Sequence, residues 1–409
     1  MTNKTNNESQ QLLSGVRVVD IGHAVAGPFA CSLMADFGAE VIKIEQPGKV
    51  DTMRLLGPRK DGIALWWKVA GRNKKCITLN FQHERGREIL LQLVSVSDVL
   101  VENFRPGTLQ KYGLGWEDLR RVNPKLVMLS ISGFGQTGPY SHKPGFGRIA
   151  EAFSGASQLT GEPDHPPMHV GYSLADTLSG LMGGFAVIMA LYHRQVSGRN
   201  EGEYIDLALY EPLFRLIDWQ AIVYQQLGEI PIRAGNRFPD ILSGVVANVY
   251  RSVDGHWFTL SSATDSVTQR LLELTGGPEL LSDPRFATPE ARREHIQELD
   301  RILAEWIASR PAREIEQLFE EKGAVISRVY DIQDIFTDPQ YRARANIIEV
   351  EDPDLRSVAM PGIIPKFERA PGKVLWTGPK LGMHNQDVYT GLLGLSDAEL
   401  SKLVQLGVI

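Results

Sequence analysis

The fold is decided by residues 16–45, which read VRVVDIGHAVAGPFACSLMADFGAEVIKIE. The apolar run at 16–21 predicts a strand, the small apolar residues at 27–37 have helical spacing, and the run at 39–45 predicts a second strand. A strand, a helix and a strand in this order form a βαβ unit, whose two strands lie parallel in one sheet. The stretch therefore predicts the opening of a doubly wound, Rossmann-like α/β domain.

Helices and strands continue to alternate beyond this unit, as far as about Leu207. The pattern predicts strands at 76–79, 98–102 and 126–131, helices at 84–95 and near 108–112, and helical structure at 210–227. A Gly-, Pro- and Asn-rich break at 230–243 then indicates a domain boundary.

The second half of the chain predicts a smaller domain and a return segment. An alternating run at 245–261, with a turn at Asp254-Gly255, precedes charged amphipathic helices at 266–322, which is typical of an α+β domain. The Pro-rich tail from 350 holds an extended stretch at 373–382 and an amphipathic helix at 397–406. We therefore expect a disordered tail at 1–12, a large domain at 13–228, a linker and small domain at 229–345, and a return to the large domain at 346–409.

The composition is that of an ordinary soluble globular protein, with 22% charged and 43% hydrophobic residues among 409. A formal net charge of -6 offers no general basic surface for nucleic acid. Cys31 and Cys76 are too few for a disulfide framework and suit the core of a protein in a reducing compartment. The polar start lacks the features of a signal peptide, and the longest apolar stretch, 180–192, is too short to span a bilayer. We expect a cytoplasmic protein with no nucleic-acid or membrane partner.

Asp176 stands out because it lies between a short predicted strand and a nearly uncharged helix. Burial disfavours an ionised carboxylate unless hydrogen bonds or a function compensate. One interpretation is an N-cap, in which the carboxylate accepts backbone N–H bonds at the helix start. The other is a nucleophile that the helix dipole keeps ionised. The local residues alone favour the cap.

Two common motifs are present only in part. Residues 133–138 read GFGQTG, a literal G-x-G-x-x-G, but Pro139 follows at once and no helix opens there for a pyrophosphate. Residues 171–175 read GYSLA and lack the final glycine of a nucleophile elbow. The nine histidines and two cysteines show no H-E-x-x-H or paired C-x-x-C motif, so we predict no metal site.

Basic residues flank two of the predicted strands. Asn73-Lys74-Lys75 precedes one strand, while Arg105 and Lys111 follow another, near the carboxyl edge where open α/β sheets bind ligands. Loop cations of this kind are usually solvated. Two basic turns beside strands of one sheet are nevertheless suited to holding phosphates without a P-loop.

Taken together, these segments resemble the family III CoA-transferases, the formyl-CoA, carnitine and bile-acid group, over residues 13–409. Several blocks in a fixed order carry the resemblance, which is more specific than any one block. The blocks are 13–20 (LSGVRVVD), 26–28 (AGP), 36–45 (DFGAEVIKIE), 72–75 (RNKK), 102–107 (ENFRPG), 133–140 (GFGQTGPY) and Asp176.

The resemblance makes Asp176 the nucleophile and so reverses the preference for a cap. It implies that Asp176 attacks the thioester of an acyl-CoA donor, giving a mixed anhydride and CoA thiolate, and that the thiolate then forms an aspartyl-CoA thioester. The acceptor carboxylate repeats the sequence in reverse. CoA thioesters are thus implied as substrates, with no tightly bound cofactor. Backbone N–H groups at Thr177 or in a nearby Gly turn are candidates for an oxyanion hole.

The resemblance also implies CoA contacts in three places: the first βα turn, the residues before the predicted strand at 76–79, and the residues after the predicted strand at 98–102. These are His23, Ala24, Val25, Ala26, Lys74, Lys75, Asn103, Phe104, Arg105, Thr108 and Lys111. The chain departs from the family in three places. Gln46 stands where some members have a basic residue, Val25 stands where the formyl-CoA branch has Gln, and the glycine-rich flap of that branch is not reproduced at 236–246.

Arg148 is the main clue to the substrate. Phe146-Gly147, followed by Arg148, replaces a Tyr-Asp or Tyr-Glu pair common in the family. The segment looks like the branch that uses succinyl-CoA and dicarboxylates (malate, citramalate, glutarate, benzylsuccinate). Because Arg binds a carboxylate through two hydrogen bonds, Arg148 is a candidate for recognising the carboxylate that is not activated, with Phe146 beside the substrate. A structural Arg at a helix start explains the residue equally well.

The resemblance further implies an interlocked dimer, formed either by two identical chains or with a paralogous subunit. The leading function is transfer of CoA from succinyl-CoA, or a similar acyl-CoA, to a dicarboxylic acid. An acyl-CoA racemase of the same fold and a subunit of a heteromeric CoA-transferase are the alternatives.

Overall fold

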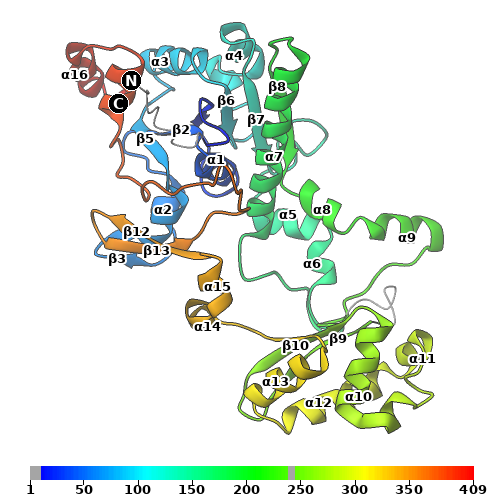
Figure 1. Ribbon diagram of the computed structural model, residues 1–409. Helices are drawn as coiled ribbons and strands as arrows, with labels where there is room; N and C mark the ends of the chain where they lie inside the picture. The colour runs from blue at the N-terminus through cyan, green and yellow to red at the C-terminus, as the bar shows by residue number, and fades with distance from the viewer. Residues whose placement is uncertain (1–10, 238–244) are drawn as a thin grey trace. The chain divides into compact units, whose positions relative to one another are not determined.

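The computed structural model describes residues 11–237 and 245–409 (Figure 1). Most of the expected tail at 1–12, and residues 238–244 of the expected linker, lie outside the described residues. The chain divides into two compact units. The sheet unit comprises Met1–Ser154, Gly171–Leu216 and Arg342–Ile409, and the small unit comprises Gly155–Val170 and Ile217–Tyr341.

A six-stranded sheet forms the centre of the sheet unit. Its strands are β1 (Arg17–Asp20), β2 (Glu40–Glu45), β5 (Lys74–Thr78), β6 (Val99–Glu102), β7 (Val127–Ser132) and β8 (Glu203–Ala208). They lie in the order β5-β2-β1-β6-β7-β8, and every neighbouring pair is parallel. This is the strand order of a doubly wound sheet. Successive strands are added on one side of β1 as far as β5 and on its other side from β6 onward. The predicted α/β class is confirmed.

The helices follow the predicted alternation, with one shorter element. The sheet unit holds α1 (Ala26–Asp36), α2 (Leu65–Ala70), α3 (Glu84–Ser95), α4 (Trp116–Val122), α5 (Gly147–Phe153), α7 (Leu174–Ser197) and α8 (Glu211–Leu216). The helix predicted near 108–112 is a single 3-10 turn, η2 (Gln110–Tyr112), which Gly113 ends at a φ of 65°. Cys31 and Cys76 are buried, as predicted.

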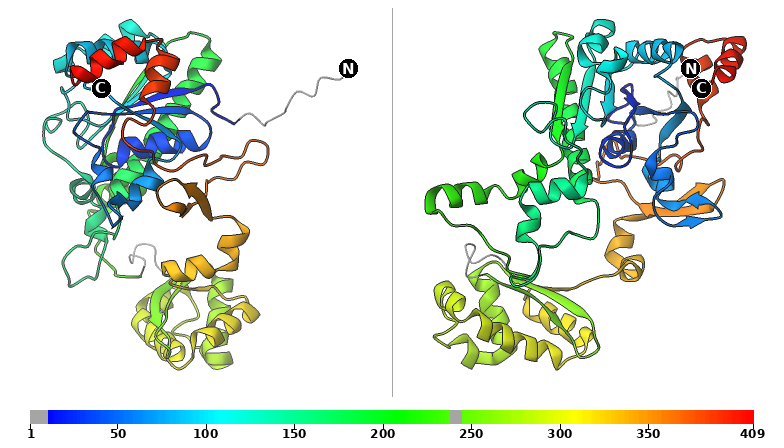
Figure 2. Two further views of the ribbon diagram at one scale, coloured as in Figure 1. Left: turned by 90° about the vertical axis from the view of Figure 1, so that its left-hand side faces the viewer. Right: turned by 180° about the vertical axis from the view of Figure 1, so that it is seen from behind.

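Helix α7 packs closely on α1 and on the sheet, as both views of Figure 2 and the glycine positions indicate. A Cβ at Gly180 would lie 2.6 Å from the Ala26 carbonyl oxygen, and one at Gly183 would lie 2.8 Å from Leu129. The helix is longer than the apolar stretch seen in the sequence, because it continues through Arg194 to a left-handed Gly198. By length and composition alone it could cross a membrane, but one of its faces is buried in the sheet unit.

The C-terminal segment completes the sheet unit. A hairpin of β12 (Ile347–Asp352) and β13 (Arg356–Pro361) is followed by extended chain, a π-helical turn η4 (Asp387–Leu392) and α16 (Asp397–Gln405). Asn73 Nδ2 donates to the Lys373 carbonyl at 2.8 Å and Asn73 Oδ1 accepts from Leu375 N at 2.7 Å, so the segment covers the edge strand β5. The α16 helix lies beside α3 (Figure 1), and Leu403 shares the core with Leu90.

The small unit has the predicted α+β elements. Antiparallel strands β9 (Val246–Arg251) and β10 (Trp257–Ser262) flank the predicted turn, and β11 (Ile326–Arg328) joins β10. Its helices include α6 (Ala156–Leu159), α9 (Trp219–Leu227), α10 (Asp265–Leu281), α11 (Pro289–Glu294), α12 (Ile296–Ala308), α13 (Ala312–Lys322) and α14 (Ile332–Thr337), with α15 (Pro339–Ala343) at the boundary.

Residues 155–170, as well as 217–228, belong to the small unit, whereas the sequence analysis assigned both segments to the large domain. The Arg233 guanidinium donates to the carbonyl oxygens of Gln158, at 3.2 Å, and His165, at 3.0 Å. Gly235 N donates to the Gly161 carbonyl at 3.1 Å. These bonds join the segment to the linker, which no local sequence pattern reveals.

Candidate active site

Two loops meet at the carboxyl edge of the sheet, where its strand order reverses. One is the turn His23–Val25 between β1 and α1, and the other follows β6. His23 N donates to Asn103 Oδ1 at 2.7 Å, and Asn103 Nδ2 donates to the His23 carbonyl at 2.8 Å. The rings of His23 and Phe104 contact edge to face, with centroids 5.5 Å apart. The structure thus brings these predicted residues together at the place where doubly wound sheets bind ligands.

The loop after β6 adds exposed cations to this edge. Arg105 and Lys111 are exposed, and Thr108 is half-buried in a turn in which its N–H donates to the Arg105 carbonyl at 3.1 Å. Phe81, just beyond β5, places its ring 6.0 Å from that of Phe104. The sequence analysis missed Phe81, although its position after the carboxyl end of a strand was a usable signal.

Both lysines are already paired with carboxylates, Lys74 with Asp20, the last residue of β1, and Lys75 with Glu40, the first residue of β2. Lys74 is fully buried, and its ammonium donates to Asp20 Oδ2 at 3.0 Å and to the Pro28 carbonyl at 2.6 Å. Lys75 donates to Glu40 Oε1 at 2.6 Å, beside the amino end of β2. The two lysines begin β5, whereas ligands of parallel sheets bind beyond the carboxyl ends of the strands. Their side chains stabilise the sheet unit in this arrangement.

Asp176 is the third residue of α7, not its cap. Ser173 occupies the N-cap position, so the capping interpretation is wrong. The Thr177 N–H donates to the Ser173 carbonyl at 3.0 Å and is therefore not available for an oxyanion. Within the described part of the chain, we find no donor bonded to the Asp176 carboxylate.

The surroundings of Asp176 make its carboxyl group a weak acid. Burial, followed by the negative charge of Glu151, raises the pKa of Asp176 to about 6. Glu151 is only 3% exposed and lies one turn along α5 from Gly147. A Cβ at Gly147 would lie 2.4 Å from Asp176 Oδ2, so this glycine leaves just enough room for the carboxylate. The sequence analysis did not identify Glu151.

An apolar cavity of about 180 Å³ opens between α1 and α2. Its lining includes Val25, Phe29 and Trp66, and it reaches Thr177, the residue after Asp176. The cavity therefore extends from the predicted CoA turn to the first turn of α7, the helix that carries Asp176. Apolar walls of this kind exclude water from a reactive centre.

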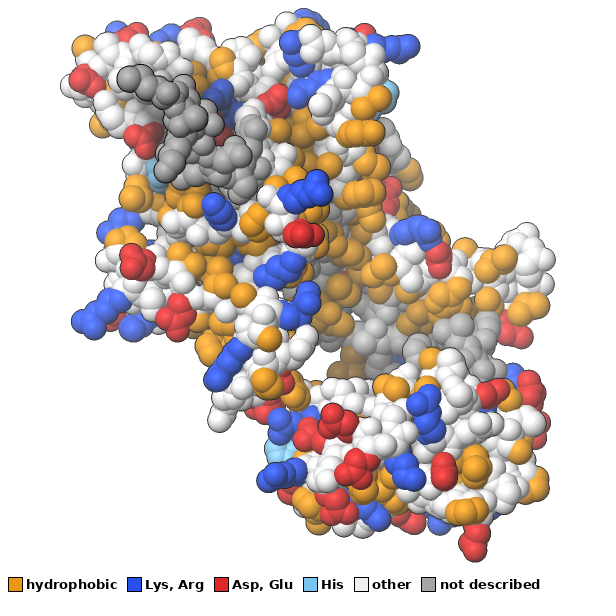
Figure 3. All heavy atoms as spheres, in the orientation of Figure 1, with side chains coloured by type: hydrophobic (Ala, Val, Ile, Leu, Met, Phe, Trp, Pro, Cys, Tyr) orange, Lys and Arg blue, Asp and Glu red, His pale blue; other side chains and the backbone are white. Residues whose placement is uncertain are grey.

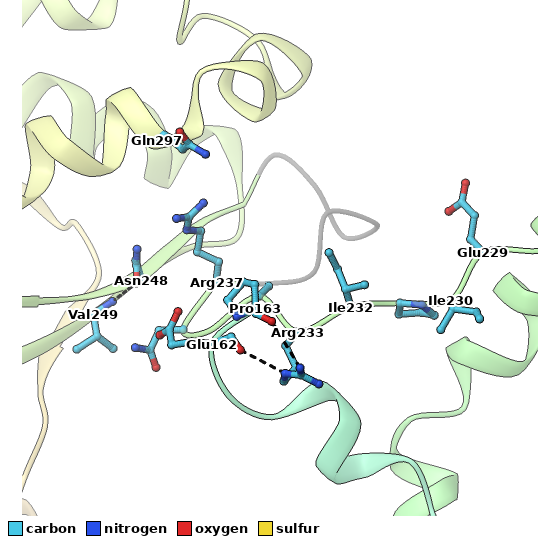
Figure 4. A pocket seen from close by; sticks show the side chains of 13 residues that line it. Glu162, Pro163, Glu229, Ile230, Ile232, Arg233, Arg237, Asn248, Val249 and Gln297 are labelled. Carbon is cyan, nitrogen blue, oxygen red and sulfur yellow. Dashed lines mark hydrogen bonds between the residues drawn. The ribbon is translucent and has the colours of Figure 1, made fainter. Parts of the chain in front are cut away.

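A larger cavity, of about 580 Å³, belongs to the small unit (Figure 4). Glu162, Glu229, Arg233 and Arg237 contribute charges of both signs to its lining. The Arg233 side chain is directed at backbone carbonyls, including that of Glu162, and Arg237 pairs with Asp300 at 3.1 Å. These cations already have partners within the unit, and the lining contains none of the residues that the sequence singled out for catalysis.

The predicted substrate residues lie at the start of α5. Phe146 is the N-cap and is 74% exposed, and Arg148 is exposed on the first turn. Gly147, which lies between them, borders the Asp176 carboxylate in space, so each of the two residues is the sequence neighbour of a residue at the nucleophile. In the described ranges, no group of three or more His, Cys, Asp or Glu side chains has the arrangement of a metal site. The GFGQTG segment passes into a turn at Pro139 and not into a helix.

Known proteins of one family are similar to this chain. The family described as CoA-transferase family III matches residues 13–385. A succinyl-CoA–D-citramalate CoA-transferase of Chloroflexus aurantiacus is 44% identical over 398 residues, which is 97% of this chain and 98% of that protein. The beta subunit of a succinyl-CoA–L-malate CoA-transferase from the same organism is 38% identical over 400 residues, which is 97% of this chain and 98% of that subunit.

A solved structure has the same fold. The crystal structure of a CAIB/BAIF family protein from Brucella suis superposes on this chain with a TM-score of 0.83 at 32% identity. The match covers 94% of this chain and 100% of that one. The family match extends over both units and includes every site residue described above. The chain therefore belongs to CoA-transferase family III.

Proposed function

We propose that this enzyme transfers CoA from succinyl-CoA, or a similar acyl-CoA, to a dicarboxylic acid, with Asp176 as the nucleophile. The observation that carries the proposal is the Asp176 carboxylate, which is largely buried, has a raised pKa and belongs to a helix start that lines an apolar cavity through Thr177. The names of the two Chloroflexus relatives support succinyl-CoA as the donor and a dicarboxylate as the acceptor.

The reaction proceeds through two kinds of aspartyl intermediate. The Asp176 carboxylate attacks the thioester carbonyl, the C–S bond breaks, and a mixed anhydride and CoA thiolate result. The thiolate then attacks the aspartyl carbonyl, which releases the donor as a carboxylate and leaves an aspartyl-CoA thioester. The acceptor carboxylate attacks this thioester, and the returning thiolate takes the acyl group from the second anhydride. Charge is conserved at each step, so no proton donor is required.

The environment of Asp176 suits this chemistry. With a pKa of about 6, the carboxylate is mostly ionised at neutral pH, yet it is poorly solvated and so more nucleophilic than in water. Both intermediates are sensitive to water, which the apolar cavity keeps away. Thr177 cannot supply the oxyanion hole, since its N–H is already bonded. The start of α1, at Val25 and Ala26, is the better candidate because its N–H groups point along the positive end of the helix dipole.

CoA is assigned to the edge where the two loops meet. His23, Ala24, Val25 and Ala26 contact the thioester end, and Asn103 and Phe104 adjoin them. Arg105, Thr108 and Lys111 extend outward from this point, and their exposed positive charges suit the phosphates of CoA. Lys74 and Lys75 are left out of this assignment because both are engaged elsewhere.

Arg148, with Phe146 beside it, is assigned to the acceptor. It lies next to Gly147, which contacts Asp176, so its guanidinium suits the distal carboxylate of an acid whose other end is activated. Arg148→Ala should raise the KM for dicarboxylates about tenfold, since one charged hydrogen-bond pair is lost, while leaving the KM for a monocarboxylate unchanged. Equal KM values for dicarboxylates in both enzymes would remove this assignment.

A second subunit completes the enzyme. The face of α7 that points away from the sheet carries exposed apolar side chains: Leu181, Phe185, Ile188, Met189, Tyr192 and Val196. Figure 3 shows hydrophobic side chains gathered on the surface of the sheet unit. An apolar surface of this extent is typical of a subunit interface. An interlocked copy of this chain, or a paralogous subunit like the relative named a beta subunit, would cover it. The expected location of the assembly is the cytoplasm.

An acceptor panel tests the function directly. The enzyme is incubated with succinyl-CoA and one of several acids, and the new acyl-CoA is separated by chromatography. Formation of a dicarboxylic acyl-CoA, abolished by Asp176→Asn, is the expected result. Exchange of an α-proton in heavy water without any transfer would instead make the protein a racemase of this fold.

A further inference from the structure

The turn between β1 and α1 has an uncommon backbone conformation. Ala24 adopts a φ of +57°, in the left-handed region that residues with a Cβ rarely occupy. Such a conformation persists only when surrounding contacts hold it, and it is frequent where a protein binds a ligand. The contacts that hold Ala24 therefore bear on how the substrate is received.

Asp51 provides the bond to Ala24. Its Oδ1 accepts from Ala24 N at 3.1 Å and from Met53 N at 2.8 Å. Lys43 holds Gly22, two residues earlier, because its ammonium donates to the Gly22 carbonyl. The two side chains thus bind the backbone on either side of His23.

Asp51 and Lys43 also bind each other. Lys43 Nζ lies 2.7 Å from Asp51 Oδ2, and both side chains are inaccessible to solvent. Burying two charges is costly, and apolar residues of similar size often give equal or greater stability. A buried ion pair is thus weak evidence of a stabilising role. Its place directly under the substrate turn indicates another purpose.

We propose that Asp51 and Lys43 are positioning residues, a buried ion pair that holds the turn His23–Val25 in the conformation that receives the acyl-CoA thioester. The inference rests on the proposed function, because it takes this turn as the site of CoA. Val25 lines the cavity that reaches Thr177, so a turn that leaves this conformation would bind the acyl-CoA less tightly. Neither residue touches the substrate, and both act through the backbone of the turn.

The first test is the variant Asp51→Asn. Because Ala24 N would lose a charged acceptor, the KM for succinyl-CoA and the Kd for CoA should both rise about tenfold. The KM for the acceptor acid and kcat at saturating succinyl-CoA should change less than about twofold. A residue with only a structural role would lower the folded fraction without this separation between KM and kcat.

A second variant covers the case in which Asp51→Asn does not fold. The double substitution Lys43→Met with Asp51→Leu removes both charges of the pair. The nearby Asp20 stays paired with Lys74, at 3.0 Å. The melting temperature should equal or exceed that of the parent, while CoA binding, measured by calorimetry, should weaken about tenfold. Parent-like CoA affinity in this folded double variant would overturn the proposal.

A matched control removes a comparable pair elsewhere in the sheet unit. Lys68 Nζ lies 2.8 Å from Asp352 Oδ2, and both side chains are buried. Lys68→Met with Asp352→Leu should leave the Kd for CoA unchanged. If the control weakened CoA binding as much as the test variant, the specific role of Asp51 and Lys43 would be lost.

The proposal and the proposed function fail in different ways. Asp176→Asn should bind CoA like the parent and transfer nothing. If the parent bound CoA but transferred none, the proposed function would fail, and the CoA affinities of the variants would still decide the positioning role. If the parent did not bind CoA, both would be wrong.

Discussion

Asp51 and Asp176 are two aspartates of the sheet unit with opposite surroundings. Burial alone would raise the pKa of Asp51, but the Lys43 ammonium outweighs it and the Met53 N–H adds to the effect, so the pKa is lowered. Asp176 has no comparable partner in the described residues, and its pKa is raised to about 6. The Asp51 carboxylate therefore holds the turn of the site in place, whereas the Asp176 carboxylate stays reactive because no hydrogen-bond donor in the described residues stabilises its charge.

The largest effect should come from removing the reactive carboxylate. Asp176→Asn should lower kcat for CoA transfer by at least about three orders of magnitude, because an amide cannot form the anhydride. Steady-state assays with succinyl-CoA measure it, and an unchanged Kd for CoA is the control. Turnover within tenfold of the parent would remove Asp176 from the chemistry.

The next largest effect should come from moving the same carboxylate without removing it. A Cβ at Gly147 would lie 2.4 Å from Asp176 Oδ2, so Gly147→Ala should displace the carboxylate by about 1 Å and lower kcat about a hundredfold. The melting temperature should change little, since a side-chain end can yield. Gly171→Ala, where nothing lies within 4 Å, is the matched control and should retain activity.

The two aspartates should also differ in the sign of their effect on stability. The pKa of Asp176 lies above its ordinary value of 3.8, so the unfolded chain releases this proton first. The fold therefore loses stability as the pH rises from about 4 to about 6, and the loss persists above pH 6. Asp176→Asn should raise the free energy of unfolding at neutral pH by about 1 to 3 kcal/mol.

Asp51→Asn should do the opposite, because it leaves Lys43 buried without its nearest partner. The free energy of unfolding should fall by about 3 kcal/mol. Urea denaturation of both variants at pH 7 makes the comparison. Changes of the same sign would show that the two carboxylates are not in contrasting environments.

The smallest effect should be a shift in the pH profile. Since Glu151 adds to burial in raising the pKa of Asp176, Glu151→Gln should lower that pKa and move the acid limb of kcat to lower pH, by less than about one unit. The exposed Glu88→Gln, on α3, should leave the limb unchanged. A shift to higher pH in the Glu151 variant would contradict the assigned electrostatics.

Much of the fold followed from local patterns. The spacing of apolar residues predicted β1, α1 and β2, and the same rule placed α3 and α16, because an element's period is set by residues close in sequence. The grouping of 155–170 with the small unit was not predictable. It depends on hydrogen bonds from Arg233 to the carbonyls of Gln158 and His165, which lie 75 and 68 residues earlier in the chain.

The candidate site was predictable only in part. Blocks of sequence identified Asp176 and the turn at His23, and the structure brings that turn to Asn103. Lys74 and Lys75 were assigned from the family resemblance, which does not reveal that both ammonium groups are paired with carboxylates. Two further features arise from tertiary packing, which no local motif encodes. These are the contact of Gly147 with Asp176 and the hydrogen bond that Ala24 N donates to Asp51.

The most direct measurement is chemical trapping of Asp176 during turnover. The enzyme is mixed with succinyl-CoA, quenched with borohydride or hydroxylamine, digested and analysed by peptide mass. The account predicts modification of Asp176 alone, dependent on succinyl-CoA and absent from Asp176→Asn, while Asp51 stays unmodified. An unmodified Asp176 in an enzyme that turns over fully would contradict it.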